Sequence, residues 1–132
     1  MPRGERSTVM TLRVPEHVDR RIQQKRGAIV TVAARRAYTG KPRPALIVQS
    51  DLFNPTHASI TICPITSDHV DAPLFRLTLP PGPRTGLKVV SQVMLDKVVS
   101  VPRAAITGEI GECDARELEA VQDGLRRWLQ LD

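Results

Sequence analysis

From Gly27 onward the apolar residues come in short runs that glycines and prolines interrupt, and this pattern limits the folds open to the chain. The runs are AIVTVAA (28–34), ALIVQS (45–50), SITICPIT (59–66) and LFRLTLP (74–80). Each is rich in β-branched residues or leucine and is shorter than an average helix of about 11 residues. We therefore expect a sheet of short antiparallel strands, joined by turns and ordered loops.

Two segments near the C-terminus differ from these runs. Residues 88–102, KVVSQVMLDKVVSVP, are too long and too rich in valine for one strand, so we expect two strands with a break near residues 94–96. The segment DARELEAVQDGLRRWLQL predicts an amphipathic helix that Asp114 caps together with Glu117. Gly124 inside it lowers the stability of this helix by up to about 1 kcal/mol. Strands followed by a closing helix predict a mainly β fold, a small curved sheet or open barrel with the helix packed on it.

The first 26 residues behave differently from the rest of the chain. They hold seven Lys and Arg against three Asp and Glu, which is most of the net charge of +5 and leaves residues 27–132 nearly neutral. A nucleic-acid site in the main domain must therefore consist of a few well-placed cations. Residues 9–14 and Pro15 look like the start of a ribbon-helix-helix subunit whose second helix is missing. We interpret residues 1–26 as an N-terminal extension, either dispensable or with a role of its own, and 27–132 as one compact domain.

Several classes of protein do not fit this sequence. No apolar run approaches the roughly 18 residues of a membrane span, and the N-terminus has no secretory apolar stretch, so we expect a soluble, cytoplasmic protein. Cys63 and Cys113 lie far apart without a CxxC partner, which predicts reduced, structural cysteines. His17, His57 and His69 are isolated, and no HExxH, P-loop or GxSxG motif occurs. We expect neither a metal ion nor a cofactor.

Arg43 is a polar residue for which fold stability gives no obvious reason, since it stands between Pro42 and Pro44 in KPRPALIVQSD. Its guanidinium is planar and permanently charged, and the prolines limit how its backbone moves. Such a fork suits a phosphate. Other polar residues occur at further strand ends, in PITSD (64–68) and SQVMLDK (91–97).

The segments RGAIVTV, KPRPALIVQSD, ICPITS, TGLKVVSQVMLDKVVSV and IGE with the C-terminal helix come in a characteristic order. In that order and approximate spacing the chain resembles the MazF/PemK (Kid) toxins of bacterial toxin–antitoxin pairs over residues 26–131. The resemblance implies an SH3-like barrel that forms a homodimer and cuts single-stranded RNA at short sequences. It also implies cleavage without metal, leaving a cyclic phosphate and a 5′-hydroxyl, and a MazE-like antitoxin whose C-terminal tail occupies the same groove.

The resemblance further implies a catalytic guanidinium and hydroxyl that bind one phosphate. Arg43 would neutralise the charge that builds on the phosphorane, and Thr66 would donate a hydrogen bond to the same phosphate. Many family members carry a Glu in the loop before this Arg, which is absent here, and some carry an Arg two residues before the position of Asp96, where this chain has Met94. The residues expected to contact RNA are Lys41, Phe53, Ser67, Ser91, Gln92 and Asp96, of which Phe53 would stack on a splayed base and the serines and Gln92 would bind base edges.

Simpler roles are open for some of these residues. Arg43 can pair with Asp51 or another carboxylate. Thr66 and Ser67 can close a strand in an ordinary turn, and Phe53 can belong to the core.

Two other functions are open as well. CcdB-type toxins share the fold but poison DNA gyrase by protein binding, with a Trp near the C-terminus as a contact, and Trp128 superficially fits that role. The RPALIV and PITS matches belong instead to the ribonuclease branch. The basic extension also fits a catalytically inactive antitoxin-binding or DNA-binding module.

Overall fold

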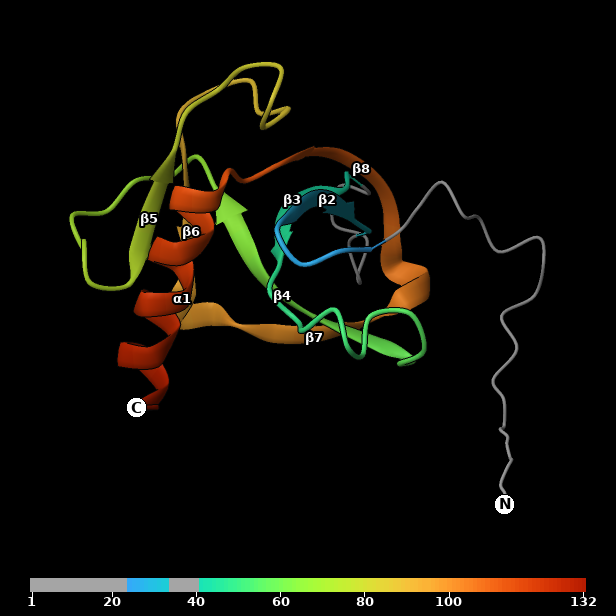
Figure 1. Ribbon diagram of the computed structural model, residues 1–132. Helices are drawn as coiled ribbons and strands as arrows, with labels where there is room; N and C mark the ends of the chain where they lie inside the picture. The colour runs from blue at the N-terminus through green and yellow to red at the C-terminus, as the bar shows by residue number, and fades with distance from the viewer. Residues whose placement is uncertain (1–23, 34–40) are drawn as a thin grey trace.

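The computed structural model describes residues 24–33 and 41–132, and it shows a curled antiparallel sheet with a helix against one side (Figure 1). The strands are β2 (Ala28–Val32), β3 (Arg43–Ile47), β4 (Ser59–Thr66), β5 (Arg76–Leu79), β6 (Ser91–Met94), β7 (Val99–Pro102) and β8 (Ile106–Glu112). They follow the order β5-β6-β4-β3-β2-β8, with β7 paired to the first half of β4. The other elements are the 3-10 turns η1 (Leu95–Lys97) and η2 (Arg103–Ala105) and the helix α1 (Ala115–Leu129).

The predicted mainly β fold with a C-terminal helix is confirmed, and so is the break in residues 88–102, which η1 occupies. The sheet is open, since no pairing joins its outer strands β5 and β8 in the part of the chain that the structure describes. Two strand predictions were wrong. β3 begins at Arg43 and ends at Ile47, so Arg43 lies on the strand and not before it, and β8 was not expected at all.

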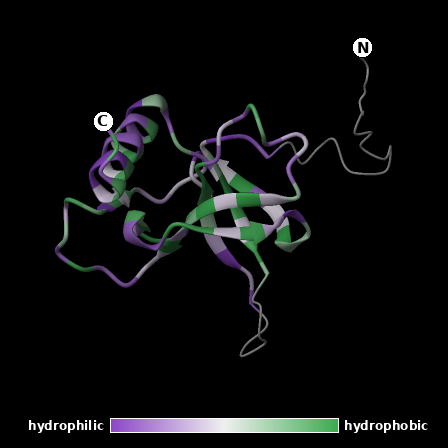
Figure 2. Ribbon diagram, turned by 90° about the horizontal axis from the view of Figure 1, so that it is seen from below, coloured by the Kyte–Doolittle hydropathy of each residue, from purple (hydrophilic) through white to green (hydrophobic). Residues whose placement is uncertain are grey.

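Helix α1 forms as its sequence predicts. The side chain of Asp114 accepts the backbone N–H of Glu117 at 2.8 Å, and the Glu117 side chain accepts that of Asp114 at 2.9 Å, so the capping box is complete. The helix packs on β5 and η1 through its buried residues Val121 and Gly124. Figure 2 shows hydrophilic residues on its outer side and hydrophobic residues along the strands.

Each face of the sheet has its own core. Ile29, Leu46 and Cys63 belong to the face that α1 covers, which also holds Ile65 and Val93. The opposite face lies inside the curl of the sheet, where the core consists of Ala28, Val30, Ala45, Ile47, Ile60, Ile62 and Ile106. Because side chains alternate along a strand, every residue of β3 and β4 is thereby assigned to one face or the other.

Other predictions are settled in part. Cys63 and Cys113 are both free, and burial raises the pKa of each thiol to about 12, which suits structural cysteines. No helix in the described part of the chain is long and apolar enough to cross a membrane. Of the predicted extension, 1–26, all but residues 24–26 lies outside the described residues, so that boundary stays a prediction.

Candidate functional site

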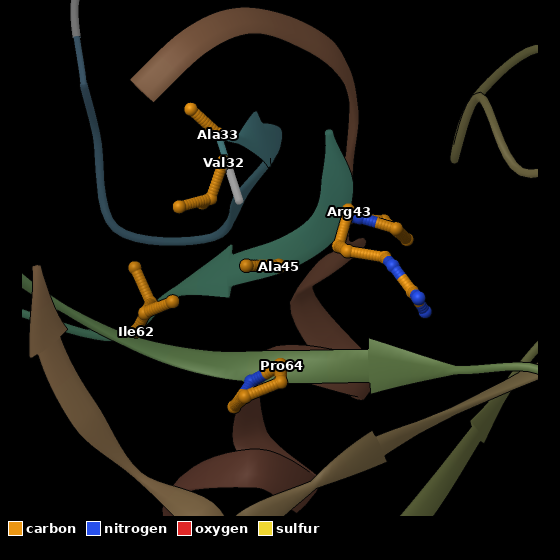
Figure 3. A pocket seen from close by; sticks show the side chains of 7 residues that line it. Val32, Ala33, Arg43, Ala45, Ile62 and Pro64 are labelled. Atoms are coloured by element: carbon orange, nitrogen blue, oxygen red, sulfur yellow. The ribbon is translucent and has the colours of Figure 1, made fainter. Parts of the chain in front are cut away.

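Arg43 is the first residue of β3, and its side chain is exposed. In Figure 3 the guanidinium extends toward the C-terminal end of β4. Among the described residues it forms no ion pair. The pair with Asp51 does not occur, because that carboxylate lies at the other end of the β3–β4 hairpin and accepts hydrogen bonds from the Arg26 backbone N–H and the Asn54 amide. Within residues 24–33 and 41–132, no carboxylate therefore competes with an outside anion for the guanidinium of Arg43.

Thr66 is the last residue of β4, and the strand register points it toward Arg43. The structure pairs Ala45 with Pro64, and the same register continued by two residues places Arg43 across from Thr66. Directly opposed residues in antiparallel strands have Cα atoms about 5 Å apart and point to one face. The Thr66 hydroxyl accepts the N–H of Asp68 at 3.0 Å, so its own hydrogen remains for donation. This strand-end pair, Arg43 and Thr66, thus offers one charged and one neutral donor side by side.

Gln92 lies on the other side of Thr66, as its partner on β6. Its amide oxygen accepts the N–H of Val70 at 3.1 Å, and its amide nitrogen donates to the Val70 carbonyl at 2.9 Å. The residue is only 7% exposed. The amide that was expected to bind a base edge therefore holds the loop 67–75, which begins directly after Thr66.

The ion pair between Arg76 and Asp96 was not expected from the sequence. Arg76 on β5 is the register partner of Met94, and its Nε donates to Asp96 Oδ1 at 3.3 Å. The two side chains are 10% and 16% exposed, and Arg76 Nη1 lies 3.5 Å from the amide oxygen of Gln92. This chain thus brings an arginine to Asp96 from the neighbouring strand, although Met94 stands where some family members have one. This contact follows from the register between β5 and β6, which the sequence alone does not show.

A pocket of about 180 Å³ opens beside Arg43, on the face that also carries Thr66 (Figure 3). Its lining residues are Val32, Ala33, Arg43, Pro44, Ala45, Ile62 and Pro64. Apart from Arg43, these side chains are apolar. No motif in the sequence marks the apolar members of this set as a group.

The remaining predicted residues divide into two groups. Lys41 and Ser67 are exposed and lie close in sequence to the strand-end pair. Phe53 is 55% exposed in the loop at the opposite end of the β3–β4 hairpin, so the structure places it neither at this site nor in the core. Ser91 is buried on the helix-covered face, where its hydroxyl donates to the Val89 carbonyl. The structure therefore does not bring Phe53 or Ser91 to the strand-end pair.

Within residues 24–33 and 41–132, no three His, Cys, Asp or Glu side chains are grouped as a metal site requires. The chemistry available at the strand-end pair is that of fixed hydrogen-bond donors and one permanent positive charge.

The comparisons with known proteins all find members of one family. The family model of the PemK-like, MazF-like toxins of type II toxin–antitoxin systems matches residues 25–129. The probable endoribonuclease MazF of Mycolicibacterium smegmatis is 54% identical over 87 residues, which is 66% of this chain and 79% of that protein. Endoribonuclease MazF6 of Mycobacterium tuberculosis is 33% identical over 92 residues, or 69% of this chain and 81% of that protein.

Solved structures show the same fold. A chain of a MazE–MazF structure from Deinococcus radiodurans superposes with a TM-score of 0.70 and 26% identity, over 83% of this chain and 99% of that one. The Mycobacterium tuberculosis toxin MazF-mt6 gives a TM-score of 0.68 at 22% identity, over 80% of this chain and 98% of that one. These findings confirm the predicted resemblance and do not favour the CcdB-type alternative.

Proposed function

Because the chain belongs to the PemK-like, MazF-like toxins of type II toxin–antitoxin systems, we propose that it cleaves single-stranded RNA at specific sequences, without a metal ion. Its relatives named endoribonuclease MazF support cleavage of RNA. The observation that carries the proposed mechanism is the strand-end pair: a guanidinium that has no ion pair among the described residues and, by strand register, a hydroxyl across from it with a hydrogen to donate.

The proposed reaction is an internal displacement at phosphorus. The ribose 2′-hydroxyl gives up its proton as its oxygen forms a bond to the phosphorus, the bond from phosphorus to the 5′-oxygen of the next nucleotide breaks, and a proton moves to that leaving oxygen. The products are a 2′,3′-cyclic phosphate and a 5′-hydroxyl. Negative charge builds on the non-bridging oxygens, where Arg43 and Thr66 donate hydrogen bonds from fixed positions. Losing one such donor typically costs about 3 to 4 kcal/mol of the barrier, or a hundredfold or more in rate.

The other residues assigned to RNA have differing support. Lys41 and Ser67 flank the strand-end pair in sequence, and we assign them to a phosphate and a base edge. Gln92 and Asp96 act on this site through their internal partners, Val70 and Arg76. Phe53 and Ser91 lie away from the strand-end pair, because the hairpin and the sheet hold them elsewhere.

We also propose the partners that the family uses. A structural neighbour from Deinococcus radiodurans was solved as MazE–MazF, so a MazE-like antitoxin is the expected inhibitor of this chain. A carboxylate that such an antitoxin brought to this site would compete with RNA phosphate for Arg43. We further propose a homodimer that acts in the cytoplasm, where single-stranded RNA is accessible. A monomeric mass at micromolar concentration would contradict the dimer.

One cleavage assay tests the mechanism. Purified protein is incubated with a randomised RNA pool in EDTA, beside the variants Arg43→Ala, Thr66→Val and Thr66→Ser. Cleavage is expected to persist in EDTA and to fall at least a hundredfold in Arg43→Ala and Thr66→Val, whereas Thr66→Ser keeps the hydroxyl and most of the rate. The 5′-hydroxyl ends of the products report the sequence at the cut.

Other results of the same assay would remove the proposal. Products that carry a 5′-phosphate, or full activity in both Arg43→Ala and Thr66→Val, would exclude this mechanism. Intact RNA together with inhibition of DNA gyrase would favour the CcdB-type function instead.

A further inference from the structure

The pocket beside Arg43 has no part in the phosphate chemistry proposed above. It is formed where the curl of the sheet opens, between the ends of β2 and β3 and the middle of β4. Val32, Ala45 and Ile62 continue the core that lies inside the curl. Pro44 and Pro64 complete a wall without a side-chain donor or acceptor. Apart from Arg43, the recess therefore takes an apolar surface and offers it no hydrogen bond from a side chain.

We infer that this pocket receives the base of a nucleotide that flanks the scissile phosphate and selects that base by size, an inference that rests on the proposed cleavage of RNA. A nucleotide joins a flat base with apolar faces to a negatively charged phosphate. The site offers the matching pair of features, since Val32 of the pocket wall is the register partner of Arg43. Their Cα atoms are therefore about 5 Å apart, and one nucleotide can reach both.

Selection by size follows from the composition of the wall. Discrimination between bases with the same ring system requires donors or acceptors at the base edges. The side chains that line the pocket, Arg43 apart, supply none. The pocket therefore distinguishes a pyrimidine from a purine at one position of the cleavage sequence, but not adenine from guanine or cytosine from uracil.

An apolar side chain of a bound peptide is the other occupant that such a recess accepts. The strand-end pair favours the nucleotide, because a guanidinium and a neutral hydroxyl donor side by side match the non-bridging oxygens of a phosphodiester. The pocket shares its face of the sheet with this pair, so a base in the pocket and a phosphate at the pair belong to one bound segment.

The test changes the volume of the pocket at Val32, a half-buried residue at the end of β2. Val32→Phe fills the recess and Val32→Ala enlarges it. The matched control is Thr31→Phe, because the neighbouring side chain points to the other face, where its hydroxyl lies 2.7 Å from that of Thr107. Thermal unfolding of each variant establishes that it is folded before its activity is compared.

Each protein is given a randomised single-stranded RNA pool, and the ends of the products are sequenced. Val32→Phe is expected to lower cleavage of the pool at least tenfold and to shift one flanking position toward pyrimidines. Val32→Ala is expected to shift the same position toward purines, while Thr31→Phe stays within twofold of the unmodified protein.

Three outcomes overturn the inference. Equal rate and equal base preference in Val32→Phe would mean that no base enters the pocket, and would leave a peptide side chain as its occupant. Discrimination of adenine from guanine, or cytosine from uracil, at the affected position would contradict selection by size. Equal loss in Thr31→Phe would assign the effect to β2 as a whole. Failure of the proposed function looks different, since the unmodified protein would then leave the pool intact.

Discussion

Replacing Gln92 with methionine tests whether the loop 67–75 must be held in place for the site to work. Methionine fills a similar volume and lacks both groups that bind Val70. Each of the two lost hydrogen bonds is worth about 1 kcal/mol net. Val70 is 47% exposed, so water can bind its freed N–H and carbonyl and limits the loss. We expect the free energy of unfolding, measured by urea denaturation, to fall by about 2 kcal/mol.

The same change is expected to reach the Thr66 hydroxyl, to which we assign a catalytic role. The loop supplies the Asp68 N–H that binds Thr66 Oγ1 at 3.0 Å, and this contact orients the hydroxyl. Misplacing a reacting group by about 1 Å can lower a rate up to about a hundredfold. We expect Gln92→Met to lower kcat about tenfold with little change in KM, and to speed hydrogen exchange at the Val70 amide.

Gln49 provides a matched control at the far end of the β3–β4 hairpin. Its amide nitrogen donates to Asn54 Oδ1 at 3.0 Å, and its amide oxygen accepts the N–H of Thr61 at 3.1 Å. Gln49→Met therefore also removes two hydrogen bonds that hold a loop, and should lower stability by a similar amount. Its kcat is expected to stay within twofold. Equal losses of kcat in both variants, or unchanged exchange at Val70 in Gln92→Met, would refute the reasoning.

Two further predictions concern stability. A methyl group at Gly124 would lie 2.3 Å from Leu95 Cδ1. Gly124→Ala should therefore destabilise the protein by about 1 kcal/mol, despite the better helix propensity of alanine. In a Leu95→Val background, where this clash is removed, thermal unfolding should show no such penalty for Gly124→Ala. The N–H of Arg26 lowers the pKa of Asp51 below its ordinary value of 3.8. Asp51 therefore contributes stability that is fully present above its unfolded pKa and is lost as pH falls through the lower folded pKa. On acidification, the urea midpoint of Asp51→Asn should therefore fall less than that of the unmodified protein.

Local sequence rules were sufficient for several elements of this fold. The capping box of α1 needs only Asp114 and Glu117 at their spacing, and both of its hydrogen bonds form. The break near residues 94–96 follows from a segment too long for one strand, and η1 fills it. Such features depend on residues a few positions apart, which a sequence shows directly.

β8 was not predicted, because its composition is typical of a loop and only its pairing with β2 makes it a strand. The segment ITGEIGE contains Gly108 and Gly111 among glutamates, which is typical of a loop. In the structure it pairs with β2 across two register shifts, and a Cβ at position 111 would lie 2.3 Å from the backbone of Thr85. The glycine allows two backbones to approach, and this requirement appears only once both are in place.

Residues at the site were predicted from strand ends, but their orientation was not. Ser91 and Gln92 are neighbours, and alternation sends Ser91 to the helix-covered core and Gln92 to the face of Thr66. Arg76 reaches Asp96 only because β5 lies beside β6. Both facts depend on the register between strands that are distant in the sequence.

That register is set by the core on both faces of β4. A slip of one residue against β3 would bring Ile65 or Ser67 across from Arg43 in place of Thr66. It would also move Leu46 out of the core under α1 and replace it with a residue from the other face. Because both faces of the hairpin are buried, neither slip is favourable. Apolar packing elsewhere in the hairpin thus leaves β3 and β4 a single favourable alignment, and the continuation of that alignment sets Arg43 across from Thr66.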